Sequence, residues 1–161
     1  MVFVYHFLYS PHSSLASKAN TFFKDLEKGN YIGTISSFTI TEFLAVVKRI
    51  LCNKRDKAVS ENDVRVIRES LDKFIAQMGI ALYDADTLVA GTTVFSDCED
   101  IVESAVPYKG KRNRKWHYVS GADALHVALA IAVKAELYAT FDDDFRGVKE
   151  WINPFMLSEV Y

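Results

Sequence analysis

Hydrophobic residues recur every three or four positions in four long parts of the chain, which is the period of an amphipathic helix. The turn-forming run Ser-Pro-His-Ser-Ser at residues 10–14 precedes the first of them, and Gly29 and Asn30 follow it. Thr39 or Thr41 is the expected N-cap of the second. The spacing therefore predicts helices over residues 15–26, from that cap to residue 50, from residue 62 or 63 to 78, and over 121–135.

Three short β-prone segments alternate with these helices, at residues 31–36, 80–83 and 136–140. Residues 84–100 are expected to be helical in part, residues 106–118 to be the least regular stretch, and residues 142–145 to form a loop. Alternation of strands and helices indicates an α/β fold with a largely parallel sheet. In such sheets the carboxyl ends of the strands gather the chemistry.

The composition is that of one globular domain spanning residues 1–161. Half of the residues are hydrophobic, and the formal net charge is only −2, which excludes a uniformly basic surface for nucleic acid. The apolar stretches are too short to span a membrane, and the first residues lack the pattern of a signal peptide. Two cysteines make no disulfide framework. We therefore expect a cytoplasmic protein that does not contact membranes.

Acidic residues stand at three places where an open α/β sheet positions chemistry. Glu42 lies in the first turn of the helix after the strand at 31–36, Asp123 begins the most apolar helix, and Asp142 follows the strand that ends at Thr140. Each has a structural explanation, since a carboxylate in a first helical turn is favoured by the helix dipole, and Asp123 must be solvated, capped or metal-bound. Taken together, converging carboxylates favour a hard divalent cation, Mg²⁺ or Mn²⁺.

Four short motifs occur in order along nearly the whole chain: Val-Phe-Val-Tyr-His at residues 2–6, Ser-Ser-Phe-Thr-Ile-Thr-Glu at 36–42, Gly-Ala-Asp-Ala-Leu-His-Val-Ala at 121–128, and Ala-Thr-Phe-Asp-Asp-Asp-Phe at 139–145. Each is short, and the third is the most specific. Together they resemble the PIN-domain nucleases, a family that includes the toxin ribonucleases of toxin–antitoxin pairs.

This resemblance implies a three-layer α/β/α sandwich with a mainly parallel central sheet. It implies that Glu42, Asp123 and Asp142 are catalytic carboxylates that hold Mg²⁺ or Mn²⁺, with Asp144 as a fourth metal ligand and Thr140 in a supporting role. The implied activity is endonucleolytic cleavage of RNA by a metal-activated water. The implied partners are RNA, an antitoxin protein and a second copy of the chain in a homodimer.

The chain departs from the family pattern at the first motif, which should be a strand ending in Asp. If residues 2–6 follow that Asp, it precedes Met1; if residues 1–5 are the strand, Tyr5 and His6 stand where Asp and a small polar residue belong. Either way one carboxylate is missing. We favour a true start upstream of Met1, because the other acidic positions are intact. The alternative is a catalytically impaired PIN-like protein that binds RNA or acts as a scaffold.

A basic segment lies shortly before Asp123, and three aromatic residues follow it directly, at positions 116–118. Cations beside aromatic rings suit an RNA backbone with stacked bases, although a solvated loop has the same composition. The four histidines, His117 among them, show no zinc-ligand spacing with the two cysteines. The predicted RNA-binding residues are Lys109, Lys111, Arg112, Arg114 and Lys115.

Overall fold

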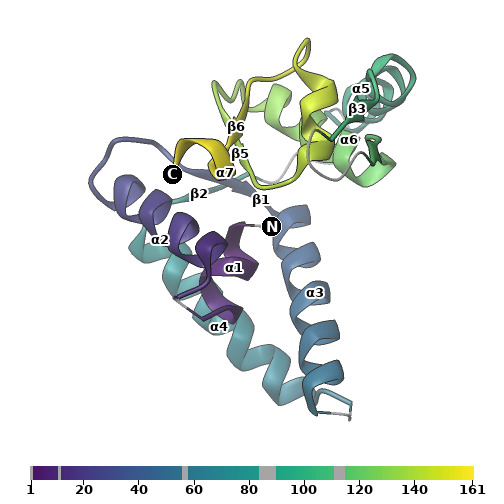
Figure 1. Ribbon diagram of the computed structural model, residues 1–161. Helices are drawn as coiled ribbons and strands as arrows, with labels where there is room; N and C mark the ends of the chain where they lie inside the picture. The colour runs from purple at the N-terminus through teal and green to yellow at the C-terminus, as the bar shows by residue number, and fades with distance from the viewer. Residues whose placement is uncertain (1, 11, 56–57, 84–89, 111–114) are drawn as a thin grey trace. The chain divides into compact units, whose positions relative to one another are not determined.

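The computed structural model describes residues 2–10, 12–55, 58–83, 90–110 and 115–161, and its elements fall into two units (Figure 1). The N-terminal unit comprises residues 1–83 and Tyr161, and the C-terminal unit comprises residues 84–160. Each unit has its own cluster of buried hydrophobic side chains. The single domain over residues 1–161 stays a prediction.

The N-terminal unit is mostly helical and carries one pair of parallel strands. Its elements are α1 (Val2–Leu8), α2 (Ser14–Glu27), β1 (Thr34–Ser36), α3 (Ser37–Arg55), α4 (Glu61–Gln77) and β2 (Ala81–Tyr83). Ile35 of β1 and Val47 of α3 are buried, in one cluster with Leu71 of α4. Parallel pairing of β1 with β2 requires the long crossover that α3 and α4 supply.

Of the two alternatives for the first motif, the one that makes residues 1–5 a strand is wrong, because Val2–Leu8 forms the helix α1. The run is rich in β-branched and aromatic residues, which favours a strand by propensity alone. In the fold, Phe3 and Phe7 are one helical turn apart, and both rings contact those of Phe43 and Phe74. This aromatic packing overrides the local propensity.

The first turn of α3 also differs from the prediction. The helix begins at Ser37, and Oγ of Ser36 accepts a hydrogen bond from the backbone N–H of Thr39 at 3.2 Å. Thr41 instead lies inside the helix, where its hydroxyl donates to the carbonyl oxygen of Ser37 at 3.0 Å. Ser36 ends the strand and stabilises the start of the helix, so that β1 leads into α3 without a loop.

The C-terminal unit combines helices with two short sheets. The elements are α5 (Ala90–Ser104), β3 (Tyr108–Lys109), β4 (Trp116–His117), α6 (Gly121–Ala132), β5 (Tyr138–Thr140), the 3₁₀ helix η1 (Asp143–Val148), β6 (Pro154–Met156) and α7 (Leu157–Val160). α5 packs against α6, and buried residues of both helices share one cluster with Phe145 and Val148. β5 and β6 pair in parallel, whereas β3 and β4 pair antiparallel.

Three details of this unit correct the sequence predictions. The stretch expected to be least regular contains the β3–β4 hairpin, and the expected loop after Thr140 is largely the 3₁₀ helix η1. α6 ends at Ala132 rather than residue 135, because Lys134 takes the left-handed conformation with φ of 54°.

The predicted α/β class is confirmed. Two of the three strand pairs in the described residues are parallel, and helical segments lie between the two strands of each parallel pair, which is compatible with the predicted α/β/α sandwich. In the part of the chain that the structure describes, no helix combines the length and the apolar character needed to cross a membrane.

Candidate metal centre

The candidate centre begins where β5 ends, at Thr140. The Thr140 side chain is buried, and its Oγ1 accepts a hydrogen bond from the backbone N–H of Asp142 at 3.0 Å. Asp142 is the N-cap of η1, and its Oδ1 accepts from the backbone N–H of Asp144 at 3.1 Å. Two residues of the predicted metal set, Asp142 and Asp144, are thus held by one turn at the carboxyl end of a parallel strand, with Thr140 as its buried support.

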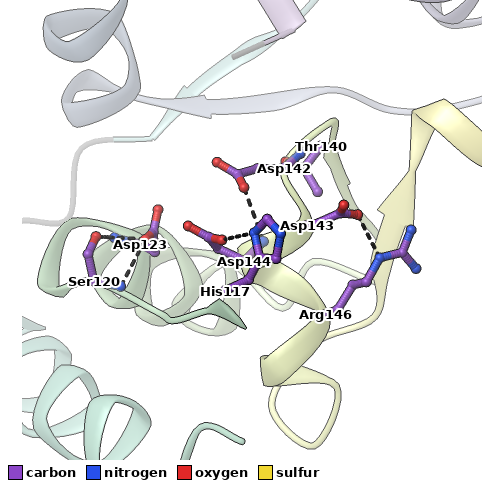
Figure 2. A network of polar contacts seen from close by, with 8 residues as sticks. All are labelled: His117, Ser120, Asp123, Thr140, Asp142, Asp143, Asp144 and Arg146. Atoms are coloured by element: carbon purple, nitrogen blue, oxygen red, sulfur yellow. Dashed lines mark hydrogen bonds and ion pairs between the residues drawn. The ribbon is translucent and has the colours of Figure 1, made fainter. Parts of the chain in front are cut away.

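His117 of β4 joins these two carboxylates (Figure 2). Its Nδ1 lies 2.7 Å from Oδ1 of Asp144. His117, Asp142 and Asp144 each offer one ligand atom, and these three atoms lie within 4.8 Å of one another. The His117 side chain is 19% exposed and that of Asp144 is 28% exposed, so this pair is partly shielded from water.

Asp123 serves as a helix cap. Its Oδ2 accepts hydrogen bonds from the backbone N–H of Ser120 at 2.9 Å and from the Ser120 hydroxyl at 2.6 Å, while Ser120 Oγ accepts from the N–H of Asp123 at 3.2 Å (Figure 2). This capping box stabilises the start of α6. Both of the hydrogen bonds that Asp123 accepts from Ser120 go to Oδ2, and Oδ1 takes no part in this capping box.

The same box occurs at the start of α4, between Ser60 and Asp63. There Oδ2 of Asp63 accepts from the backbone N–H of Ser60 at 3.2 Å and from its hydroxyl at 2.8 Å. Because α4 carries none of the predicted site residues, the box alone is not a sign of catalysis. What distinguishes Asp123 is that its charge raises the pKa of Asp144.

The electrostatics of the centre disfavour negative charge on Asp144. Burial is the largest cause that raises the pKa of Asp144, and the charges of Asp142 and Asp123 raise it further. The hydrogen bond and the charge of His117 act in the opposite direction and only partly offset this rise. Carboxylates that repel one another in this way are stabilised by a bound cation.

Asp143 points away from this cluster and helps to fix η1. Its Oδ1 accepts a hydrogen bond from Nε of Arg146 at 2.7 Å (Figure 2). The same guanidinium donates to Oε1 of Glu159 at 2.5 Å. Arg146 also lies over the ring of Tyr108, 5.3 Å from its centroid. The middle residue of the Asp-Asp-Asp run is therefore structural.

The remaining predicted residues belong to other segments of the chain. The prediction that Glu42 lies in the first turn of its helix is wrong, because α3 begins at Ser37 and its first turn carries no acidic residue. Glu42 is half-buried in the N-terminal unit, and its role in the metal centre stays a prediction. Lys109 and Lys115 are exposed on or beside the β3–β4 hairpin. The other predicted RNA-binding residues, Lys111, Arg112 and Arg114, lie outside the described residues.

The donor set fits a divalent cation. Mg²⁺ and Mn²⁺ prefer carboxylate oxygens, and imidazole nitrogen is a good ligand for Mn²⁺ and later transition metals. Adjacent ligands of an octahedral Mg²⁺ are about 2.9 Å apart and opposite ligands about 4.2 Å apart. The three donor atoms lie within 4.8 Å of one another, so modest side-chain rotations would bring them onto one ion. Asp142, Asp144 and His117 are therefore suited to hold such an ion.

Sequence reasoning did not identify His117 as part of the centre. Twenty-seven residues separate it from Asp144, and it follows no ligand spacing with the other histidines and cysteines. The sequence does offer one signal: in a β-strand His117 lies on the opposite face from Trp116 and Tyr118. In the structure Trp116 and Tyr118 are exposed, whereas the His117 side chain is only 19% exposed.

Comparison with known proteins gives one family. The family model of the PIN domain matches residues 2–150. No curated protein and no solved structure matches the chain. The match covers most of the sequence and includes the elements that carry Asp123, Asp142, Asp144 and His117. The chain therefore belongs to the PIN domain family.

Proposed function

We propose that this protein is a divalent-metal-dependent endoribonuclease that cleaves RNA phosphodiesters by hydrolysis. PIN domains are typically nucleases and generally use divalent metals, so membership of the family supports a nuclease-type function. The observation that carries the proposal is the convergence of Asp142, Asp144 and His117, with the charge of Asp123 acting on Asp144. Three segments of the chain supply these side chains: His117 comes from β4, Asp123 from the first turn of α6, and Asp142 and Asp144 from the start of η1.

Each residue has a distinct task in the proposed reaction. Asp142 and Asp144 hold Mg²⁺ or Mn²⁺, and Thr140 fixes the turn between them. His117 orients the carboxylate of Asp144 and offers a nitrogen ligand. When bound, such an ion activates a water and neutralises charge on the phosphodiester. Lys109 and Lys115 attract the RNA backbone, which offsets the repulsion between phosphate and carboxylates.

Glu42 and Asp123 complete the proposed set on the strength of the sequence motifs. The same resemblance supports the further proposals that the protein is a toxin of a toxin–antitoxin pair, that it forms a homodimer, and that it acts in the cytoplasm. Glu42→Gln tests whether Glu42 is a metal ligand, because the loss of a ligand must weaken both cation binding and cleavage.

The proposal is tested with protein freed of metal by EDTA and then supplied with Mg²⁺ or Mn²⁺. Cleavage of an end-labelled RNA should appear only with the cation. Asp142→Asn should lower kcat at least about 100-fold, a size typical for loss of one strong electrostatic contribution. It should also reduce the rise in melting temperature that the cation produces, since binding to the native state raises stability.

Asp143→Asn is the matched control for that experiment. The residue is the direct neighbour of Asp142, but its carboxylate pairs with Arg146. Its substitution should keep the metal-dependent cleavage and the metal-induced rise in melting temperature. If Asp142→Asn and Asp143→Asn behave alike, the metal centre is misassigned.

A second function, RNA binding without cleavage, is favoured by one observation. Oδ2 of Asp123 and Oδ1 of Asp142 each accept capping hydrogen bonds, so both residues have a structural reason to be acidic. A protein of this kind would bind RNA equally well with EDTA and with Mn²⁺ and would leave it intact. The cleavage assay above separates the two functions.

A further inference from the structure

Arg146 joins three segments of the C-terminal unit. Its Nε donates to Oδ1 of Asp143 in η1 at 2.7 Å, its Nη2 donates to Oε1 of Glu159 in α7 at 2.5 Å, and its guanidinium lies over the ring of Tyr108 in β3. The Arg146 side chain is only 14% exposed, so little water competes with its carboxylate partners. The position of η1 therefore depends on where α7 holds Glu159.

Tyr161, two residues after Glu159, is fixed to the second helix of the N-terminal unit. Its hydroxyl donates to Oδ2 of Asp25 at 2.8 Å, and Nζ of Lys18 donates to its backbone oxygen. Lys18 and Asp25 are seven positions apart on α2, which places them two turns apart on one side of the helix. We call these three residues, Lys18, Asp25 and Tyr161, the Tyr161 clasp.

The clasp restricts Glu159, because the chain between them is short. Two residues of backbone span at most about 7 Å. Leu157, at the start of α7, is fully buried, so the segment 157–161 is held at both of its ends. A carboxylate on a fixed segment loses less conformational entropy when it forms an ion pair than one on a free tail does. Glu159 is thus preorganised to bind Arg146.

η1 is the element that carries the candidate metal ligands. Asp142 is its N-cap, and Oδ1 of Asp142 accepts a hydrogen bond from the backbone N–H of Asp144 at 3.1 Å. Asp143, between these two residues, pairs with Arg146 (Figure 2). A continuous series of contacts therefore runs from the Tyr161 clasp through the ion pairs of Arg146 to the turn that holds the two ligands.

We propose that Tyr161 and Glu159 are positioning residues for the metal centre: the clasp on α2 holds the turn of η1 in the conformation that binds the cation. Tyr161 groups with residues 1–83, whereas Glu159 belongs to the C-terminal unit, so the two units are coupled through this segment. The inference rests on the proposed function and adds a control of its metal centre. Because coupling between sites is reciprocal, cation binding and the docking of Tyr161 stabilise each other.

The first test follows hydrogen exchange of the backbone N–H of Asp144 by NMR in EDTA, so that it needs neither cation nor cleavage. Tyr161→Phe removes the hydroxyl that binds Asp25. It should raise the exchange rate at Asp144 about 5-fold or more, the lower end of usual coupling between sites. Lys18→Met removes the other contact of the clasp and should act in the same direction.

Asp63→Asn is the matched control for a general loss of stability. It weakens the cap of α4 in the unit with which Tyr161 groups, but it lies outside the series of contacts. The exchange rate at Asp144 should therefore stay unchanged in Asp63→Asn. A purely structural role of Tyr161 would instead give the same result for both variants.

Glu159→Ala tests whether the contacts act in series. It removes the ion pair with Arg146 and should also raise the exchange rate at Asp144. The double variant Tyr161→Phe/Glu159→Ala should exchange no faster than the faster of the two single variants, because both changes interrupt the same series of contacts. Independent contributions would multiply instead.

Binding of Mn²⁺, measured from the EPR signal of the free ion, is the second test. Tyr161→Phe should weaken this binding about 5-fold, the size expected from the same coupling. Asp63→Asn should leave it unchanged.

Three results would overturn the inference: equal exchange rates at Asp144 in the parent and Tyr161→Phe, an equal acceleration by Asp63→Asn, or multiplied effects in the double variant. If exchange responds as expected but the parent binds no Mn²⁺, the proposed function fails, while the positioning of η1 by the clasp stands. If the parent binds Mn²⁺ and cleaves RNA but exchange at Asp144 does not respond, the reverse holds.

Discussion

Asp123 combines two roles that a substitution can separate. Its Oδ2 caps α6 through Ser120, and its charge raises the pKa of Asp144 in the candidate centre. Asp63 caps α4 through Ser60 in the same geometry, without any site residue nearby on its helix. A comparison of the two positions therefore distinguishes the structural contribution of such a carboxylate from its part in cation binding.

We predict that Asp123→Asn and Asp63→Asn each lower the free energy of unfolding of the metal-free protein by about 0.3–1 kcal/mol, the usual contribution of a charge at a helix N-terminus. Only Asp123→Asn should reduce the rise in melting temperature caused by Mn²⁺. Urea unfolding in EDTA and melting curves with and without Mn²⁺ measure the two effects. An equal response of both variants to Mn²⁺ would make Asp123 a helix cap and nothing more.

At this scale the sequence predicted part of the centre. Asp142 was singled out because a strand ends just before it, and Asp144 through the resemblance to the PIN family. The structure brings the two side chains together in one turn, and their role as metal ligands stays a prediction. His117 was missed because its contact with Asp144 depends on how the β3–β4 hairpin packs on η1. Contacts between residues so far apart in the chain produce no characteristic spacing by which the sequence could reveal them.

Among the elements, helices with clear polar caps were predicted well. Ser13 caps α2 and Ser60 caps α4, and the expected bounds of both helices are close to those observed. Gly29, with φ of 79°, follows α2 where its stop was expected. The alternative of a strand over residues 1–5 failed because short apolar runs satisfy strand and helix patterns alike, and tertiary packing of aromatic rings decides between them.

Gly147 shows how η1 is fixed to the segment before β3. A Cβ atom at this position would stand 2.5 Å from the carbonyl oxygen of Val106, which is backbone and cannot swing away as a side chain can. Only glycine allows the two segments to approach so closely. The hairpin and the turn that carries Asp144 therefore depend on this residue.

We predict that Gly147→Ala lowers the free energy of unfolding by about 1–3 kcal/mol, as overpacking does. Gly121→Ala is the matched control, because a Cβ at that helical position meets nothing within 4 Å. It should raise the free energy of unfolding by about 0.4–1 kcal/mol, through reduced freedom of the unfolded chain. Urea unfolding measures both. Equal effects of the two changes would show that the approach of Gly147 to Val106 does not constrain the fold.

On the scale of the whole molecule, the last residue is tied to the second helix. The hydroxyl of Tyr161 donates to Oδ2 of Asp25 at 2.8 Å, and Nζ of Lys18 donates to the backbone oxygen of Tyr161. Tyr161 accordingly groups with residues 1–83 rather than with the segment that precedes it in the chain. These contacts close a loop of more than a hundred residues, which constrains the folded chain.

Burial is the largest cause that raises the pKa of Tyr161, and its hydrogen bond to Asp25 adds to the rise. Because the folded pKa lies above the unfolded value of about 10, this group contributes stability that is complete below pH ~10 and is lost as the pH rises through the folded pKa. Tyr161→Phe removes the hydroxyl, and with it both the hydrogen bond to Asp25 and the group that titrates.

We predict that Tyr161→Phe lowers the free energy of unfolding by about 0.5–1.5 kcal/mol at pH 7, the net value of one hydrogen bond. Above pH 10 the melting temperature of the variant should fall less steeply than that of the parent. Melting curves between pH 7 and pH ~11.5 measure both effects, with Tyr118→Phe, whose residue is 61% exposed, as the control. Parallel pH profiles for parent and Tyr161→Phe would mean that this hydroxyl does not hold the end of the chain on α2.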